Sequence, residues 1–172
     1  MDVGESLVGA YLRHVAECDV VTYNTYFADR QGEVDVVGIK NGSPRTVWLC
    51  EVTTHIGGMQ IVRKGKNATS EVILSKLDRL HAFANTTFPD EHHHFQWWSP
   101  RVAVGALTAA MTAIENDWVG LGRELRFIIN EEYTDCIREL MAHAATNSST
   151  TNEPAYRLLQ VLTRLRGGPL GI

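Results

Sequence analysis

Two acidic residues, Asp35 and Glu51, stand in apolar segments and could hold a divalent metal ion together. Both segments predict strands, and if the turn between them is centred near Ser43, Asp35 falls opposite Glu51. Directly paired positions across a hairpin are about 4.5–5.5 Å apart at Cβ. Facing carboxylates repel each other, and burial raises the pKa of one of them strongly. A cation between them is the simplest explanation, and Mg²⁺ prefers oxygen ligands of this kind.

The chemistry that such a site supports is phosphodiester hydrolysis. A bound Mg²⁺ lowers the pKa of a water and neutralises charge on a phosphate. The alternative is a solvated strand edge, and Glu33 in particular could be an ordinary exposed carboxylate. The apolar residues around the pair, such as Val34, Val36 and Leu49, favour a buried hairpin. Buried carboxylates are rare unless they are paired, which favours the metal site.

The motifs in this region resemble those of the PD-(D/E)XK nuclease superfamily, of restriction-enzyme and Holliday-resolvase type. The matching pieces are Gly-Glu at 4–5 in a predicted helix, Gly-Glu-Val-Asp at 32–35, and Cys-Glu-Val-Thr at 50–53. The resemblance implies that Asp35 and Glu51 bind Mg²⁺ or Mn²⁺. It also implies that Glu5 assists, and Glu33 would support the metal. A first-turn Glu5 equally suits the helix dipole.

Thr53 departs from the family pattern, which has lysine at this position. A threonine hydroxyl carries no charge, so it cannot replace the lysine ammonium electrostatically. Lys76, in a predicted helix, is the first candidate for a replacement, although it could equally be a solvated helix residue. Lys64 and Lys66 are the next candidates. Alternatively, the site no longer cuts, and the protein binds nucleic acid or another partner.

Further residues could contact nucleic acid around this centre. His55 shares the strand face of Glu51 and could bind phosphate or act as a base. Arg63, Lys64 and Lys66 form a short basic loop that suits phosphate contacts. The alternative for all four is a solvated surface position.

The segment His92-His93-His94 suggests a metal site less clearly. Consecutive residues point in different directions, so three histidines in a row make a poor single site. Trp97 and Trp98 follow closely and could stack on unpaired bases. Packing in a core or a dimer is the alternative for these tryptophans.

The elements that must position these residues follow from hydrophobic periodicity. Helices are predicted at 3–16, with Asp2 as N-cap, and at 69–84, 112–121, 131–144 and 153–166; strands are predicted at 20–27, 33–39, 45–54, 101–107 and 125–130. Residues 86–99 are predicted to be a polar connection. The order αβββαβαβαα predicts an α/β fold with a mixed central sheet flanked by helices. The resemblance makes this a restriction-endonuclease-like αβββαβ core over about residues 3–130, with extra C-terminal helices over 131–166.

Length and composition limit the classes of protein to which the chain could belong. A chain of 172 residues suits a single domain, and the net charge of −4 excludes a surface coated in positive charge. A local basic rim would still allow phosphate contacts. The three cysteines, Cys18, Cys50 and Cys136, form no ligand spacing, which predicts free thiols in a reducing compartment.

The first hypothesis is therefore a metal-dependent nuclease that acts on DNA. The second is a catalytically inactive module of the same fold that binds nucleic acid or protein, and the third is an assembly partner without a nucleic-acid role. No apolar run approaches the roughly 18–20 residues of a membrane span, so we expect a cytoplasmic protein without a membrane partner. The resemblance suggests a homodimer, because pairing would supply a second active site.

Overall fold

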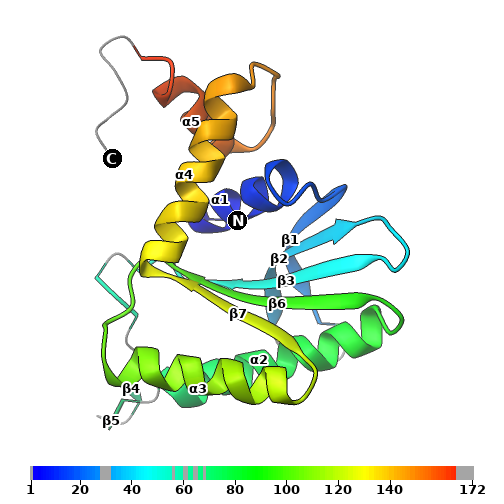
Figure 1. The fold of residues 1–172 in the computed structure, drawn as a ribbon, viewed down its shortest axis with the longest axis vertical. Coiled ribbons are helices and arrows are strands. Elements are labelled where there is room, and N and C mark those ends of the chain that lie inside the picture. The colour runs from blue at the N-terminus through cyan, green and yellow to red at the C-terminus, as the bar shows by residue number, and fades with distance from the viewer. Residues whose placement is uncertain are drawn as a thin grey trace.

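A five-stranded mixed sheet with helices on both faces organises the protein (Figure 1). The computed structural model describes residues 2–27, 32–55, 57–59, 62–63, 66–67 and 69–165. The elements are α1 (Val3–His14), β1 (Val20–Tyr26), β2 (Glu33–Lys40), β3 (Thr46–Val52), β4 (Val62–Arg63), β5 (Lys66–Asn67), α2 (Thr69–Thr87), β6 (His92–Ser99), α3 (Ala106–Gly120), β7 (Glu124–Ile129), α4 (Asn130–Thr146) and α5 (Pro154–Leu162). Apart from the small β4–β5 hairpin, this is the predicted order.

The sheet has the strand order β1-β2-β3-β6-β7 and changes direction at its centre. Strands β1, β2 and β3 are antiparallel neighbours, whereas β3, β6 and β7 run parallel. Val36 pairs with Cys50 and Lys40 pairs with Thr46, which centres the β2–β3 hairpin on residue 43. The predicted register is therefore confirmed, and continuing it by one residue places Asp35 opposite Glu51.

Alternation along the strands divides the core into two layers. Val47 and Leu49 of β3 belong to the cluster beneath α2 and α3, whereas Cys50 belongs to the cluster beneath α1 and α4. Figure 1 shows these two helix pairs on opposite faces of the sheet. Glu51 lies two residues after Leu49 and four after Val47, so its side chain points to the same face of the sheet as theirs, the face covered by α2.

The start of α1 is held close to the end of β3. Asp2 caps the helix as predicted: its Oδ1 accepts from the Glu5 backbone N–H at 2.8 Å, and Glu5 Oε2 accepts from the Asp2 N–H at 2.8 Å. A Cβ added at Gly4 would lie 1.9 Å from Thr54 Cγ2. Glycine at position 4 therefore allows the close approach that brings Glu5 to this end of the sheet.

The C-terminal helices pack on α1. The Ala155 backbone N–H donates to Ser6 Oγ at 3.2 Å, and the Tyr23 hydroxyl donates to Glu153 Oε2 at 2.6 Å. A third core cluster joins α1, α4 and α5, including Ala10, Leu140 and Tyr156. The first helix is thus fixed by segments near the far end of the sequence.

Two predicted elements are wrong. Residues 101–107 form no strand, since Val102 is buried in a loop, Val104 is 90% exposed and α3 begins at Ala106. The predicted connection at 86–99 contains the central strand β6 instead. Three histidines open the segment and Gln96 interrupts its aromatic residues, so its polar positions hid a strand that Phe95, Trp97 and Trp98 would favour.

The other predicted helices and strands are present with shifted ends. The predicted turn at 28–32 lies outside the described residues except for Gly32, as does Arg166 at the end of the last predicted helix. Cys18, Cys50 and Cys136 are free thiols, as predicted. Among the described residues, no helix combines the length and the apolar character that crossing a bilayer requires.

Candidate functional site

Asp35 and Glu51 approach each other where the β2–β3 ladder ends. The last backbone pair is Val36 with Cys50. One step further, Asp35 Oδ2 accepts a hydrogen bond from the Val52 backbone N–H at 2.7 Å. Glu51 is buried, with a side chain only 4% exposed. This hydrogen bond fixes the Asp35 carboxylate against β3, the strand that carries Glu51.

Lys76 of α2 supplies a positive charge to this pair. Its Nζ donates to Glu51 Oε2 in an ion pair. The same ammonium lies 5.6 Å from the centroid of the Trp97 ring, a cation–π contact. The Lys76 side chain is 32% exposed, so it lies at the border between solvent and the buried carboxylate. A lysine from a helix therefore lies against Glu51 and Trp97 at the edge of the carboxylate pair.

Burial dominates the electrostatics of both carboxylates. It raises the pKa of Glu51 to about 7, although the Lys76 ammonium opposes this shift; the Asp35 charge adds to it. Burial also raises the pKa of Asp35, opposed by the Val52 N–H and by Lys76. Each ionised carboxylate thus lies in an environment that disfavours its charge. A bound cation would reverse that preference.

Glu5 and Glu33 bring further negative charge to Asp35. Both raise the pKa of the Asp35 carboxyl through space. Glu5 comes from α1, and its Oε2 lies 3.4 Å from Asn24 Nδ2 of β1. Glu33 is the first residue of β2. The structure thus gathers four of the predicted carboxylates and Lys76 at one end of the sheet.

The remaining predicted residues lie farther along the chain after β3. The Thr53 backbone N–H donates to the Trp98 carbonyl at 2.9 Å, and His55 is exposed in the following loop. Arg63 and Lys66 pair through their backbones in the β4–β5 hairpin. Their side chains, and Lys64 entirely, lie outside what the structure describes. Phosphate contact by these residues stays a prediction.

The sequence placed neither Trp97 nor the Val52 N–H beside Glu51, and of the two alternatives for Trp97 and Trp98 the structure shows packing in the core, since both are buried. Trp97 pairs with Glu51 across β3 and β6, and it is 1% exposed. Its indole Nε1 is buried and has no hydrogen-bond partner within the described residues. Recognising β6 as a strand would have revealed this neighbour. A backbone donor such as the Val52 N–H leaves no sequence signal.

A second cluster that could hold a metal ion is formed by His92, His94 and Glu124. As predicted, the three consecutive histidines do not point to one site, but two of them lie together with Glu124, which the sequence did not indicate. Because 92–94 lies in a strand, His92 and His94 share a face, while His93 points to the other side.

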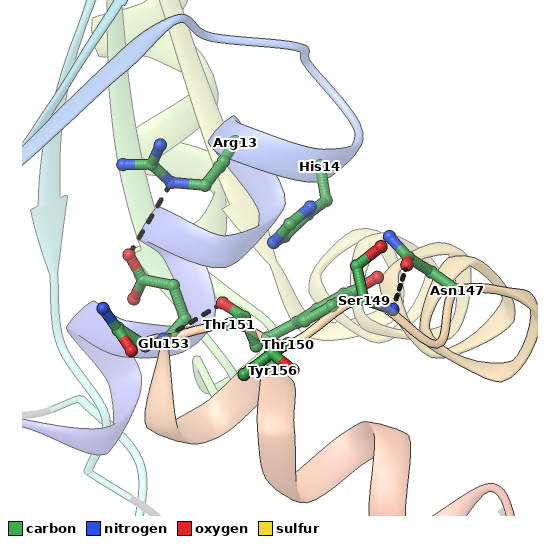
Figure 2. A pocket seen from close by; sticks show the side chains of 9 residues that line it. Arg13, His14, Asn147, Ser149, Thr150, Thr151, Glu153 and Tyr156 are labelled. Carbon is green, nitrogen blue, oxygen red and sulfur yellow. Dashed lines mark hydrogen bonds and ion pairs between the residues drawn. The ribbon is translucent and has the colours of Figure 1, made fainter.

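A separate cavity of about 400 Å³ lies where α1 meets the C-terminal helices (Figure 2). It is lined by Arg13, His14, Asn147, Ser149, Thr150, Thr151, Asn152, Glu153 and Tyr156. The His14 and Tyr156 rings stack with centroids 3.9 Å apart, and Arg13 pairs with Glu153. None of the predicted site residues lines this cavity, so it is distinct from the carboxylate site.

Comparison with known protein families, with characterised proteins and with solved structures yields no match for this chain. The functional assignment therefore depends on the geometry of the two clusters. Of these, the Asp35–Glu51–Lys76 cluster joins three elements and contains the deeply buried charge. It is the stronger basis for an activity.

Proposed function

We propose that the protein is a metal-dependent nuclease of the PD-(D/E)XK type that hydrolyses DNA phosphodiester bonds. The observation that carries the proposal is the ion pair between Lys76 and Glu51, next to Asp35. Lys76 would supply the positive charge that Thr53 does not carry. The order α1-β1-β2-β3-α2-β6 with a mixed sheet supports a restriction-endonuclease-like core.

The residues of the site fit a hard divalent cation. Asp35 and Glu51 would hold Mg²⁺ or Mn²⁺, with Glu5 and Glu33 as supporting carboxylates, because these ions prefer oxygen ligands. When bound, the ion would lower the pKa of a water molecule and neutralise phosphate charge. The raised pKa of both carboxyls supports this fit, since a cation would favour their ionised forms.

The protein's own groups would orient the reaction. The Val52 N–H holds Asp35 Oδ2, which leaves Oδ1 free to turn toward a ligand. Lys76 Nζ, held between Glu51 and the Trp97 ring, would donate a hydrogen bond to the attacking water or to a phosphate oxygen. Trp97 would exclude water from the inner side of the carboxylates. DNA is the proposed partner. A dimer of two copies of the chain would present one active site to each strand of the DNA.

A second function is favoured by the same ion pair. Lys76 neutralises Glu51 without any metal, so the site could be a stable remnant that no longer cuts. The protein would then be a non-catalytic module that binds nucleic acid or a protein partner. Its DNA binding would weaken steeply with salt, because phosphate contacts release counterions.

A cleavage assay separates the two functions. Plasmid and branched DNA are incubated with Mg²⁺ or Mn²⁺ and with the native chain, Asp35→Asn or Glu51→Gln. Both replacements keep the shape of the side chain, and the amide oxygen of Asp35→Asn can still accept from the Val52 N–H. Glu17→Gln, at an exposed ion pair with Lys40, is the control. Metal-dependent cutting that only the site variants lose supports the nuclease; salt-sensitive binding without cutting by the folded native chain supports the module.

A further inference from the structure

The N-terminal ends of β6 and β7 carry three potential ligands on one face. His92 and His94 are two residues apart in β6, and His94 pairs with Glu124 in the parallel neighbour β7. His94 Nδ1 lies 2.7 Å from Glu124 Oε2, and His92 Nε2 lies 3.0 Å from Glu124 Oε1. The two imidazole rings are 4.7 Å apart between centroids. One carboxylate thus faces two imidazole nitrogens at once.

We propose that His92, His94 and Glu124 form a transition-metal site of the Zn²⁺ class. Their ligand atoms all lie within 4.8 Å of one another. Ligands about 2.0–2.1 Å from a tetrahedral Zn²⁺ are about 3.4 Å apart, so small side-chain rotations complete the geometry. Two imidazoles select Zn²⁺, Cu²⁺ or Ni²⁺ over Mg²⁺, which prefers an all-oxygen shell. The site therefore takes a different metal from the one proposed at Asp35 and Glu51.

The site is remote from the carboxylate cluster. In the pairing of β3 with β6, His92 lies opposite Thr46, and Trp97 lies opposite Glu51. Five residues separate these positions, which is about 16 Å along a strand. The two clusters also lie on opposite faces, because His94 stacks on Trp48, which packs on the α1 side, whereas Glu51 faces α2. A metal at the histidines cannot take part in hydrolysis at Asp35 and Glu51.

Exposure indicates an open coordination position. The side chains of His94, His92 and Glu124 are 29%, 47% and 52% exposed. His94 and Glu124 also line a cavity of about 400 Å³, together with Trp48, Glu115 and Arg126. Three protein ligands and one position open to solvent is the arrangement of a zinc ion that binds water or an incoming ligand. The ion would also tie β6 to β7 by a direct cross-link.

The neighbouring Trp48 provides an optical readout. Its ring lies 5.1 Å from the His94 ring, nearly parallel to it. A paramagnetic Cu²⁺ bound to His94 would quench the fluorescence of this tryptophan. Replacing Trp48 with phenylalanine removes that part of the signal without removing a ligand.

The test is a titration of the metal-free full chain with Zn²⁺. The buffer contains saturating Mg²⁺, which occupies the proposed site at Asp35 and Glu51. Isothermal calorimetry should show one Zn²⁺ per chain, and His94→Gln or Glu124→Gln should weaken binding at least about tenfold, since each removes a ligand. His93→Gln is the matched control, because His93 lies between the two ligands in sequence but contacts the Phe88 carbonyl at 2.6 Å. Asp35→Asn should also leave Zn²⁺ binding unchanged, which separates this site from the proposed nuclease centre.

Two spectroscopic measurements on folded protein complete the test. In native protein, the side-chain NMR signals of His92 and His94 should shift with Zn²⁺ while those of His93 stay in place. Cu²⁺ should quench native fluorescence more strongly than that of Trp48→Phe. Absence of Zn²⁺ binding, equal binding by the native and His94→Gln chains, or loss of binding in Asp35→Asn would each overturn the proposal.

Discussion

The two polar clusters of this sheet differ in how deeply their charges are buried. The Glu51 side chain is 4% exposed and already has an internal cation in Lys76, whereas that of Glu124 is 52% exposed and faces two histidines. A buried carboxylate is unfavourable without positive charge, so its environment is built around a cation. An exposed carboxylate is solvated and has no such requirement. Burial of the charge, together with the type of ligand, distinguishes the proposed catalytic centre from the proposed zinc site.

The largest expected effect is on cleavage. Glu51→Gln should lower Mg²⁺-dependent DNA cleavage at least about 100-fold, equivalent to about 2.7 kcal/mol of transition-state stabilisation. The reason is that an amide is a poor ligand for Mg²⁺. Glu124→Gln should leave the rate unchanged, because Glu124 lies on the other face. Single-turnover cleavage rates measure both variants, and equal losses in the two would break the distinction between the clusters.

Lys76→Met should separate catalysis from metal binding. Loss of the ammonium should slow cleavage about 10- to 100-fold, as for removal of one charged donor at a reaction centre. Metal affinity should stay equal or increase, since Lys76 competes with the ion for Glu51. Calorimetry with Mn²⁺ and cleavage rates provide the two readouts. Lys40→Met, at the exposed Glu17 pair, is the control and should change neither.

Metal binding at the carboxylates should depend on pH. With a pKa of about 7, the Glu51 carboxyl is mostly protonated at pH 6 and mostly ionised at pH 8. Because the ion binds the ionised form, Mn²⁺ affinity should fall about tenfold between pH 8 and pH 6. Calorimetry measures this affinity in the His94→Gln variant, which lacks the histidine that could bind Mn²⁺ at the second site. A pH-independent affinity would indicate that the ion binds without Glu51.

A comparable effect is expected on the stability of the protein without metal. The pKa of Glu51 is raised in the folded state, so its contribution to stability is fully present below about pH 4.5 and is lost as pH rises through about 7. Glu51→Gln should therefore raise the free energy of unfolding at pH 8 by about 1–2 kcal/mol and change it little at pH 4.5. Urea unfolding at both pH values measures the difference.

Glu124, the exposed glutamate, is the comparison for the unfolding measurement. Glu124→Gln should change the free energy of unfolding by less than about 0.5 kcal/mol at either pH, as is usual for surface ion pairs. A larger change for Glu124→Gln than for Glu51→Gln at pH 8 would contradict the role given to burial.

The sequence predicted the carboxylate end of the sheet well, because its signals are local. A turn centred at residue 43 and the two-residue period of strands are enough to align Asp35 with Glu51. Lys76 could be named from its place between apolar helix residues. Its contact with Glu51 depends on how α2 crosses the sheet, which no local pattern specifies.

The sequence did not predict the cluster of His92, His94 and Glu124, because the local sequence patterns near it are misleading. Residues 101–107 alternate valines in the manner of a strand, yet Gly105 has a φ of 129° and Val104 is exposed. The segment at 92–99 begins with polar residues, yet β6 lies between β3 and β7. Its position between two strands outweighed the polar start of the segment. Once the strand was missed, the shared face of His92 and His94 could not be seen.

The hydrogen bond between the Ala155 N–H and Ser6 Oγ joins residues that are 149 positions apart. During synthesis on the ribosome, α1 emerges before the sheet, whereas its support from α5 emerges only after the whole sheet. The contact between α5 and the helix that carries Glu5 can therefore form only after β2 and β3 have been synthesised. A chain that ended before α5 would lack this support for α1, although α1 would keep its contacts with the sheet.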